Sequence, residues 1–287
     1  MTYLFIYLKG MLMGMADLVP GVSGGTLALI TGIYERLINA IAAINWTNFK
    51  LLLAGHISQA WKRVDGWFLV VLFVGILAAI FTFASLFKYL LSNHPVLTWS
   101  FFFGLIISSA MMLLLKHRSK QLSSWLLLLA GLVAGYLVST QPLGALPAGN
   151  LGIFIAGTVA ICAMILPGIS GSLILILLGQ YAVILAAVES REFTTLAVFA
   201  GGCVVGLMAF SRLLKWLLER YHDATLYFLA GLMLGTLFKV WPWKNDLGNV
   251  LPGTHPEPHT LSALLLMVLA TGMVWWLFRF DQSEQHT

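Results

Sequence analysis

The chain has 287 residues, of which 60% are hydrophobic and only 9% are charged, and its formal net charge is +5. Because a soluble domain usually has about 25% charged residues, this composition excludes an ordinary water-soluble enzyme and indicates that lipid surrounds most of the chain. The excess of Lys and Arg is typical of the cytoplasmic loops of membrane proteins, so we expect no nucleic-acid partner.

The predicted elements follow the same order in both halves of the chain. The first half begins with an apolar segment, residues 3–44, that is broken by a Pro-Gly pair. Residues 45–66 mix basic and aromatic side chains and predict a helix in the membrane interface. Uninterrupted apolar segments then predict transmembrane helices at residues 67–87, 96–115 and 122–140. In the second half, the broken segment is residues 151–188, and the predicted transmembrane helices are 194–218, 225–241 and 260–279.

Matching motifs indicate that the two halves arose by duplication. Residues 20–24 read PGVSG, and residues 167–171 read PGISG. Further along, the pair Gly104-Leu105 is in register with Gly231-Leu232. Since many transporters are built from internal repeats, we expect repeat 1 at residues 1–140 and repeat 2 at residues 150–280.

The distribution of Lys and Arg decides between two topologies for the broken segments. If both segments are re-entrant hairpins, 12 of the 16 basic residues lie on one face of the membrane, against 10 if both segments cross. The positive-inside rule therefore favours hairpins. Three crossings per half then turn the second half upside down and leave both termini in the cytoplasm. The predicted fold is an all-α polytopic membrane protein with two inverted repeats, each a re-entrant helical hairpin plus three transmembrane helices.

The Pro-Gly pairs break the helical backbone at membrane depth. Pro20 and Pro167 each lack a backbone donor, while Gly21 and Gly168 permit turns. Such backbone persists in a membrane only where it is buried in protein or lines a cavity. Residues 26–44 would extend about 28 Å as one helix, which is long for half a membrane.

The residues after each break are candidate ligands for an anion. The N–H groups at a helix N-terminus attract negative charge, and Ser or Thr side chains can cap such a helix. Two N-termini that face one point from opposite leaflets would suit a phosphate or a carboxylate. The predicted binding residues are Ser23, Gly24, Gly25, Thr26, Ser170, Gly171 and Ser172. The alternative is that both motifs are only tight turns that allow close helix packing.

Charged residues near the first motif are further candidates. Asp17 lies beside the break in an apolar segment, where ionisable residues are costly and functional by default. It is predicted to bind a coupling sodium ion or to carry a proton, with Glu35 as a second candidate; the alternative is a helix-end carboxylate in contact with water. Arg36 is either a ligand for an anionic headgroup or an interfacial anchor, and it can also pair with Glu35. No cofactor or metal site is predicted.

Two enzyme interpretations fit the motifs poorly. A Gly-x-Ser-Gly string also surrounds the nucleophile of intramembrane serine proteases, but that chemistry needs a base within hydrogen-bond reach of the serine. All seven histidines fall in predicted loops or at segment ends. A nucleotide-binding P-loop is excluded because no Gly-Lys-Ser/Thr follows. We therefore do not expect an enzyme.

The sequence resembles a bacterial family of polyprenyl-phosphate translocases, formerly catalogued as a domain of unknown function, in residues 15–26 (MADLVPGVSGGT), 32–35 (GIYE), 166–172 (LPGISGS) and 179–181 (GQY). The resemblance covers nearly the whole chain. It implies a flippase-type transporter of the inner membrane that returns undecaprenyl phosphate from the outer to the inner leaflet for reuse in cell-wall synthesis. The residues alone leave open a transporter or channel for a small soluble anion and an intramembrane enzyme on lipid phosphates. They do not predict an oligomeric state.

Overall fold

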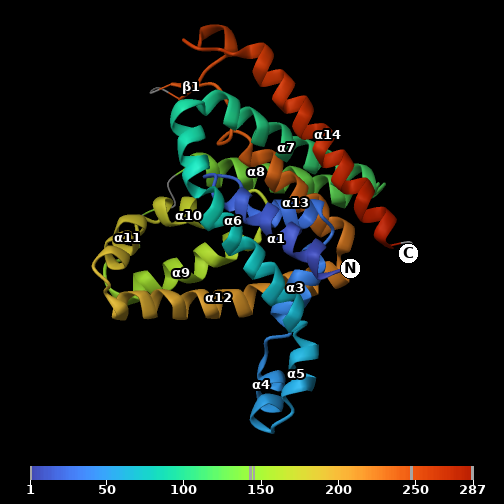
Figure 1. Ribbon diagram of the computed structural model, residues 1–287, viewed down its shortest axis with the longest axis vertical. Helices are drawn as coiled ribbons and strands as arrows, with labels where there is room; N and C mark the ends of the chain where they lie inside the picture. Colours follow the sequence, from blue (N-terminus) through green and yellow to red (C-terminus); the bar gives the residue numbers. More distant parts are fainter. Residues whose placement is uncertain (1, 142–143, 145, 246–247, 286–287) are drawn as a thin grey trace.

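The computed structural model describes residues 2–141, 144, 146–245 and 248–285, and most of them are helical (Figure 1). The first half contains α1 (Tyr3–Asp17), α2 (Gly24–Ile30), α3 (Tyr34–Ala42), α4 (Trp46–Leu53), α5 (Ile57–Arg63), α6 (Gly66–Asn93), α7 (Pro95–Lys116) and α8 (Leu122–Thr140). The second half contains α9 (Asn150–Ile165), α10 (Gly171–Leu177), α11 (Tyr181–Glu189), α12 (Phe193–Arg220), α13 (His222–Thr236) and α14 (Thr260–Gln285). The loop before α14 carries the short strands β1 (Lys244–Asn245) and β2 (Gly248–Asn249) and a 3-10 turn, Pro252–Thr254.

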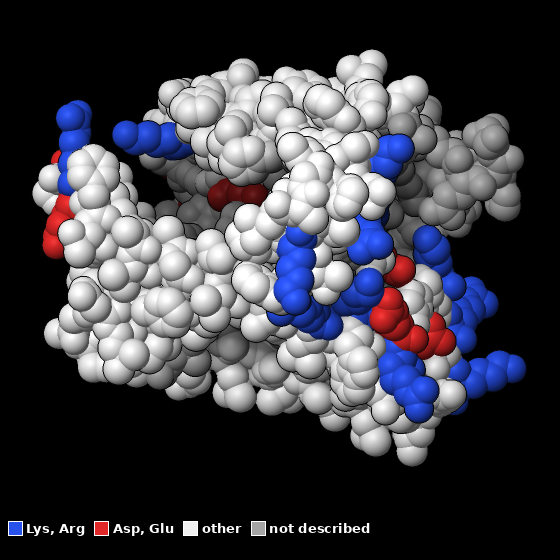
Figure 2. Space-filling view, turned by 90° about the horizontal axis from the view of Figure 1, so that it is seen from below, with Lys and Arg blue, Asp and Glu red and all other residues white. Residues whose placement is uncertain are grey.

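The long apolar helices make this a membrane protein with several spans. Within the described residues, α6, α7, α8, α12 and α14 are each long and apolar enough to cross a bilayer. Most side chains of α6 and α12 point outward although they are apolar, an arrangement that is stable only in lipid. Figure 2 shows charged side chains gathered at a few places on an otherwise uncharged surface. The predicted all-α polytopic class is confirmed.

Each broken segment is interrupted at two glycines. Gly21 and Gly168 follow the prolines with φ angles of +84° and +87°, which favour glycine. A second turn follows at Gly32 and at Gly179, with φ angles of +70° and +68°. The second turn explains why the stretch after the first break is not one long helix: α2 has only 7 residues, or about 10 Å. The chain bends by 111° between α10 and α11, at the turn around Gly179.

Glycines allow the helices of the two halves to touch through their backbones. Helices α8 and α13 pack along their length, and each carries a Gly-x-x-x-Gly pair, Gly131 with Gly135 and Gly231 with Gly235. A Cβ atom on Gly231 would collide with the Leu128 carbonyl oxygen of α8. This is the close approach that small residues permit between membrane helices.

The glycine that matches Gly231 in the first half has the corresponding role. A Cβ atom on Gly104 in α7 would lie 2.7 Å from the Met267 carbonyl oxygen of α14. Helix α7 therefore packs against the last helix of the second half, as α13 packs against the last helix of the first half. The sequence register between Gly104 and Gly231 thus corresponds to equivalent packing positions.

Two predicted segments differ from the structure. Residues 45–66 form two helices, α4 and α5, because the chain turns at Gly55 with a φ angle of +79°; they project from the body as a hairpin (Figure 1). The helix expected at 225–241 begins at His222 and ends at Thr236. The residues after it form a turn in which the Val240 N–H donates to the Leu237 carbonyl oxygen.

The packing of α8 on α13 gives a first prediction. Replacing Gly231→Ala places a methyl group against backbone, so we expect the free energy of unfolding to fall by about 1–3 kcal/mol. Gly272→Ala in α14 is the matched control, because nothing lies within 4 Å of a Cβ atom there. Thermal unfolding in detergent would measure both. Equal unfolding temperatures for the two variants would contradict the backbone contact.

Candidate functional site

The two Pro-Gly breaks lie against each other in the core of the molecule. The Ser23 hydroxyl lies 3.2 Å from the carbonyl oxygens of both Met164 and Leu166 and donates to them. The Tyr34 hydroxyl donates to the Ile165 carbonyl oxygen at 3.3 Å. These carbonyls are at the C-terminus of α9, where the last turn of a helix leaves its C=O groups without helical partners. Side chains of the first half therefore donate hydrogen bonds to the backbone carbonyl oxygens beside the second break.

In a further hydrogen bond between the two breaks, the second break supplies the donor and the first half supplies the acceptor. The Gly168 N–H, in the second break, donates to the Thr26 hydroxyl of α2 at 2.9 Å. Thr26 and Ser23 are almost fully buried. Gly25 permits the approach, because a Cβ atom there would lie 2.7 Å from the Ile165 carbonyl oxygen. The first motif is thus brought against the second break, at Gly168 and the end of α9, which sequence spacing alone could not establish.

The N-terminus of α2 is occupied by the protein's own acceptors. The Gly24 N–H donates to the Asp17 carboxylate at 2.7 Å, and the Gly25 N–H donates to the Ser23 hydroxyl at 3.1 Å. The Thr26 N–H donates to the Ser23 carbonyl oxygen at 2.9 Å. Asp17 therefore sits where the sequence predicts an external anion. A negative group at this position is favoured by the positive end of the helix.

The second motif is arranged differently. Ser170 and Ser172 share a hydrogen bond of 2.8 Å between their hydroxyls, and the Ser170 side chain does not cap α10. Gly171 begins α10 and is half-buried. Tyr181, which matches Tyr34 in the repeat, is exposed to the surroundings. The two motifs are therefore alike in backbone but not in their side-chain contacts.

Glu35 and Arg36 do not pair with each other, and each binds a different element. The Arg36 Nε atom lies 2.7 Å from an Asp65 carboxylate oxygen, and its guanidinium lies 4.3 Å from the Phe68 ring. Arg36 thus ties α3 to the beginning of α6. The Glu35 carboxylate lies 2.8 Å from Nε2 of His222 in the second half.

Two cavities flank the turn between α2 and α3. One, of about 190 Å³, is lined by polar as well as apolar groups, among them Tyr34, Glu35 and Lys116. The other, of about 580 Å³, lies between α1, α6 and α14 and has almost entirely apolar walls. Thr31 lines the apolar cavity, and its neighbour Gly32 lines the polar one. A molecule with a charged end and a long apolar end would find a polar and an apolar cavity on the two sides of the turn between α2 and α3.

Sequence reasoning missed the polar residues around the smaller cavity. Lys116 ends α7, His117 follows it, and His222 begins α13. Because histidines at helix ends are usually ordinary surface residues, their positions gave no signal. Burial lowers the pKa of His117, as do the neighbouring His222 and Lys116. Burial alone would also lower the pKa of His222, but the hydrogen bonds and charges of Glu35 and Asp223 outweigh it and raise that pKa.

The junction between the breaks gives a second prediction. Thr26→Val keeps the shape of the side chain but leaves the buried Gly168 N–H without its acceptor, which costs about 1–3 kcal/mol. We expect a lower unfolding temperature in detergent for Thr26→Val, whereas Thr26→Ser, which keeps the hydroxyl, should stay close to the original protein. A similar loss in both variants would show that the hydroxyl contact is unimportant.

Comparison with known proteins gives a consistent result. The model of the undecaprenyl phosphate translocase-like family matches residues 13–253. A polyprenyl-phosphate transporter of Vibrio cholerae is 50% identical over 304 aligned positions, covering 99% of this chain and 98% of that protein. A polyprenyl-phosphate transporter of Staphylococcus aureus is 33% identical, covering 82% of this chain and 85% of its own length. No solved structure matches the chain. The chain belongs to the undecaprenyl phosphate translocase-like family.

Proposed function

We propose that this protein is a transporter, not an enzyme, that moves undecaprenyl phosphate from the outer to the inner leaflet of the bacterial cytoplasmic membrane. The observation that carries the proposal is the contact between the two Pro-Gly breaks, which brings polar backbone and hydroxyl groups into the core. A large apolar cavity lies at the other end of α2, where Thr31 lines it. The names of the two relatives support the substrate class. Return of the carrier lipid would allow its reuse.

The lipid's two ends require different surroundings. A phosphate in an apolar medium is penalised by many kcal/mol unless it is paired or hydrogen-bonded. In our proposal, the N–H and hydroxyl groups of both motifs replace its water, at Ser23, Gly24, Gly25, Thr26, Ser170, Gly171 and Ser172. The prenyl chain stays in the apolar cavity between α1, α6 and α14, which reaches Thr31 at the C-terminal end of α2.

Asp17 would compete with the phosphate for the same groups. Its carboxylate accepts the Gly24 N–H, and two anions cannot share one helix N-terminus without strong repulsion. Headgroup entry therefore requires Asp17 to move away or to become neutral. Binding of a proton or a sodium ion to Asp17 would achieve this, which links transport to an ion gradient. Glu35 is the second candidate for this coupling, and Arg36 would act as an anchor of α3 and not as a headgroup ligand.

The proposed orientation places both termini in the cytoplasm. Twelve of the 16 basic residues then lie on the cytoplasmic face, as the positive-inside rule favours. Figure 1 shows both termini toward the same side of the molecule, which agrees with this orientation. Rocking of the two inverted halves about the junction of the breaks would expose the headgroup site to each leaflet in turn.

A reconstituted assay tests the proposed activity. Purified protein in liposomes should accelerate the movement of undecaprenyl phosphate between leaflets, measured by the accessibility of the phosphate to an externally added enzyme. Empty liposomes and liposomes with Ser23→Ala/Ser170→Ala protein are the controls, and the double variant should be slower. Uptake of inorganic phosphate without lipid movement would instead support a transporter for a small soluble anion.

The role of Asp17 gives a separate prediction. Asp17→Asn keeps an oxygen that can accept the Gly24 N–H but removes the charge, so headgroup entry no longer depends on neutralising this site. We expect lipid movement by Asp17→Asn to be insensitive to an imposed proton or sodium gradient. The same measurement on Glu35→Gln shows whether coupling is specific to Asp17. Unchanged gradient dependence in Asp17→Asn would contradict its proposed role.

A further inference from the structure

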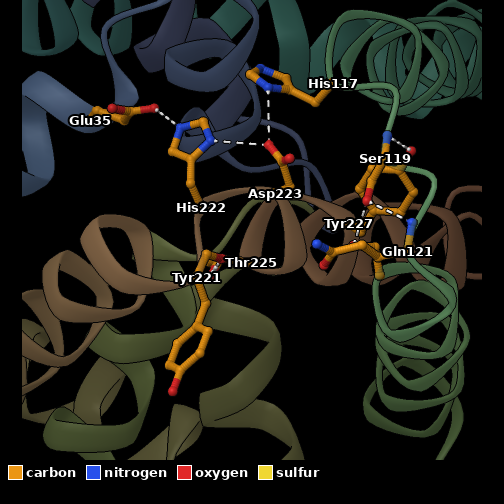
Figure 3. Close-up of polar contacts among 10 residues, drawn as sticks. Glu35, His117, Ser119, Gln121, Tyr221, His222, Asp223, Thr225 and Tyr227 are labelled. Atoms are coloured by element: carbon orange, nitrogen blue, oxygen red, sulfur yellow. Dashed lines mark hydrogen bonds and ion pairs between the residues drawn. The ribbon is translucent and has the colours of Figure 1, made fainter.

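Four side chains from α3, the end of α7 and the start of α13 converge where the two halves meet beside the polar cavity (Figure 3). His117 follows α7, while His222 and Asp223 begin α13. The Asp223 carboxylate oxygen lies 3.7 Å from Nδ1 of His117 and 3.4 Å from Nδ1 of His222. One donor atom from each of these three residues lies within 4.8 Å of the others. Glu35 of α3 contacts the far nitrogen of His222.

The spacing of these atoms suits a tetrahedral cation. A zinc ion binds His nitrogen at about 2.0–2.1 Å and carboxylate oxygen at about 2.0–2.2 Å, which separates neighbouring donor atoms by about 3.4 Å. The two separations to Asp223 are 3.4 and 3.7 Å. Small side-chain movements would therefore complete three ligands. Two imidazoles and one carboxylate also form a donor set that favours zinc and similar transition metals over magnesium or calcium.

Glu35 supplies an independent indication. Metal-binding histidines usually donate their other ring N–H to a carboxylate, which fixes the tautomer and the ring orientation. The Glu35 carboxylate lies 2.8 Å from Nε2 of His222, so an N–H at that position leaves Nδ1 free toward Asp223.

Stability alone explains this convergence poorly. The four side chains are partly exposed, and exposed ion pairs contribute only about 0–1 kcal/mol each. The two histidine rings also lie close together, with their centroids 5.2 Å apart. A divalent cation bound between the rings and the carboxylate would account for this arrangement.

We propose that His117, His222 and Asp223 bind a divalent transition metal ion of the zinc type, with Glu35 as the residue that positions His222. His117 and Glu35 also line the polar cavity, so the remaining coordination position faces a space large enough for water or another oxygen ligand. The ion would join α7 of the first half to α13 of the second half. It would thereby hold together the end of the molecule at which the polar cavity lies.

Cobalt binding tests the site directly. Full-length protein in detergent, freed of any affinity tag and treated with a chelator, should bind one equivalent of Co²⁺, with the visible absorption of a four- or five-coordinate ion, and Zn²⁺ should displace it. His222→Ala and Asp223→Asn should each weaken Co²⁺ binding at least tenfold. Glu35→Gln should weaken it by about 10–100-fold, the usual effect of removing an outer-shell partner.

Controls separate this site from adventitious binding. His259 lies in the loop before α14, away from the cluster, so His259→Ala should bind Co²⁺ as the original protein does. Zn²⁺ should raise the unfolding temperature of the original protein and of His259→Ala, because ligands stabilise the folded state, but not that of His222→Ala. The metal-free unfolding temperatures show whether each variant is folded. Absence of Co²⁺ binding, or binding that survives both His222→Ala and Asp223→Asn, would overturn the proposal.

Discussion

The structure depends on hydrogen bonds to the backbone N–H and C=O groups that two broken helices leave unpaired away from water. Each such group costs several kcal/mol in lipid, so a break persists only where the protein supplies partners. Here the partners are reciprocal: Ser23 and Tyr34 bind carbonyls at the end of α9, and Thr26 binds the Gly168 N–H. Each break thus supplies hydrogen-bond partners to the other. Glycine contacts such as that of Gly231 then hold the surrounding helices close enough to maintain this junction.

The same contacts limit the proposed transport. The groups that would receive a phosphate are paired within the protein, with Asp17 at the N-terminus of α2 and Ser23 against α9. A headgroup can enter only by replacing these partners, so the net energy of its passage is the difference between two sets of hydrogen bonds. Such an exchange has a low cost when each broken bond is replaced. In the proposed mechanism the Asp17 carboxylate and the phosphate would compete, so protonation of Asp17 or ion binding to it would control headgroup entry.

The sequence predicted the all-α polytopic class and the two Pro-Gly breaks, because their signals are local. Pro20, Gly21 and the apolar lengths specify breaks and spans without tertiary information. The turn at Gly32 was missed because a single glycine is compatible with a helix, and the turn at Gly55 was missed for the same reason. The contact between Thr26 and Gly168 and the meeting of His117 with His222 join residues far apart in the chain. No pattern of composition or periodicity encodes such contacts in a single sequence.

A reversible cross-link between the breaks tests the central claim most directly. Ser23→Cys and Leu166→Cys, introduced after replacing the native Cys162 and Cys203 with Ser, place one thiol on each side of the junction, where the Ser23 hydroxyl lies 3.2 Å from the Leu166 backbone carbonyl oxygen. If the junction must open to admit the headgroup, oxidation will stop the movement of undecaprenyl phosphate in liposomes, and reduction will restore it. Undiminished lipid movement in fully cross-linked protein would contradict the account.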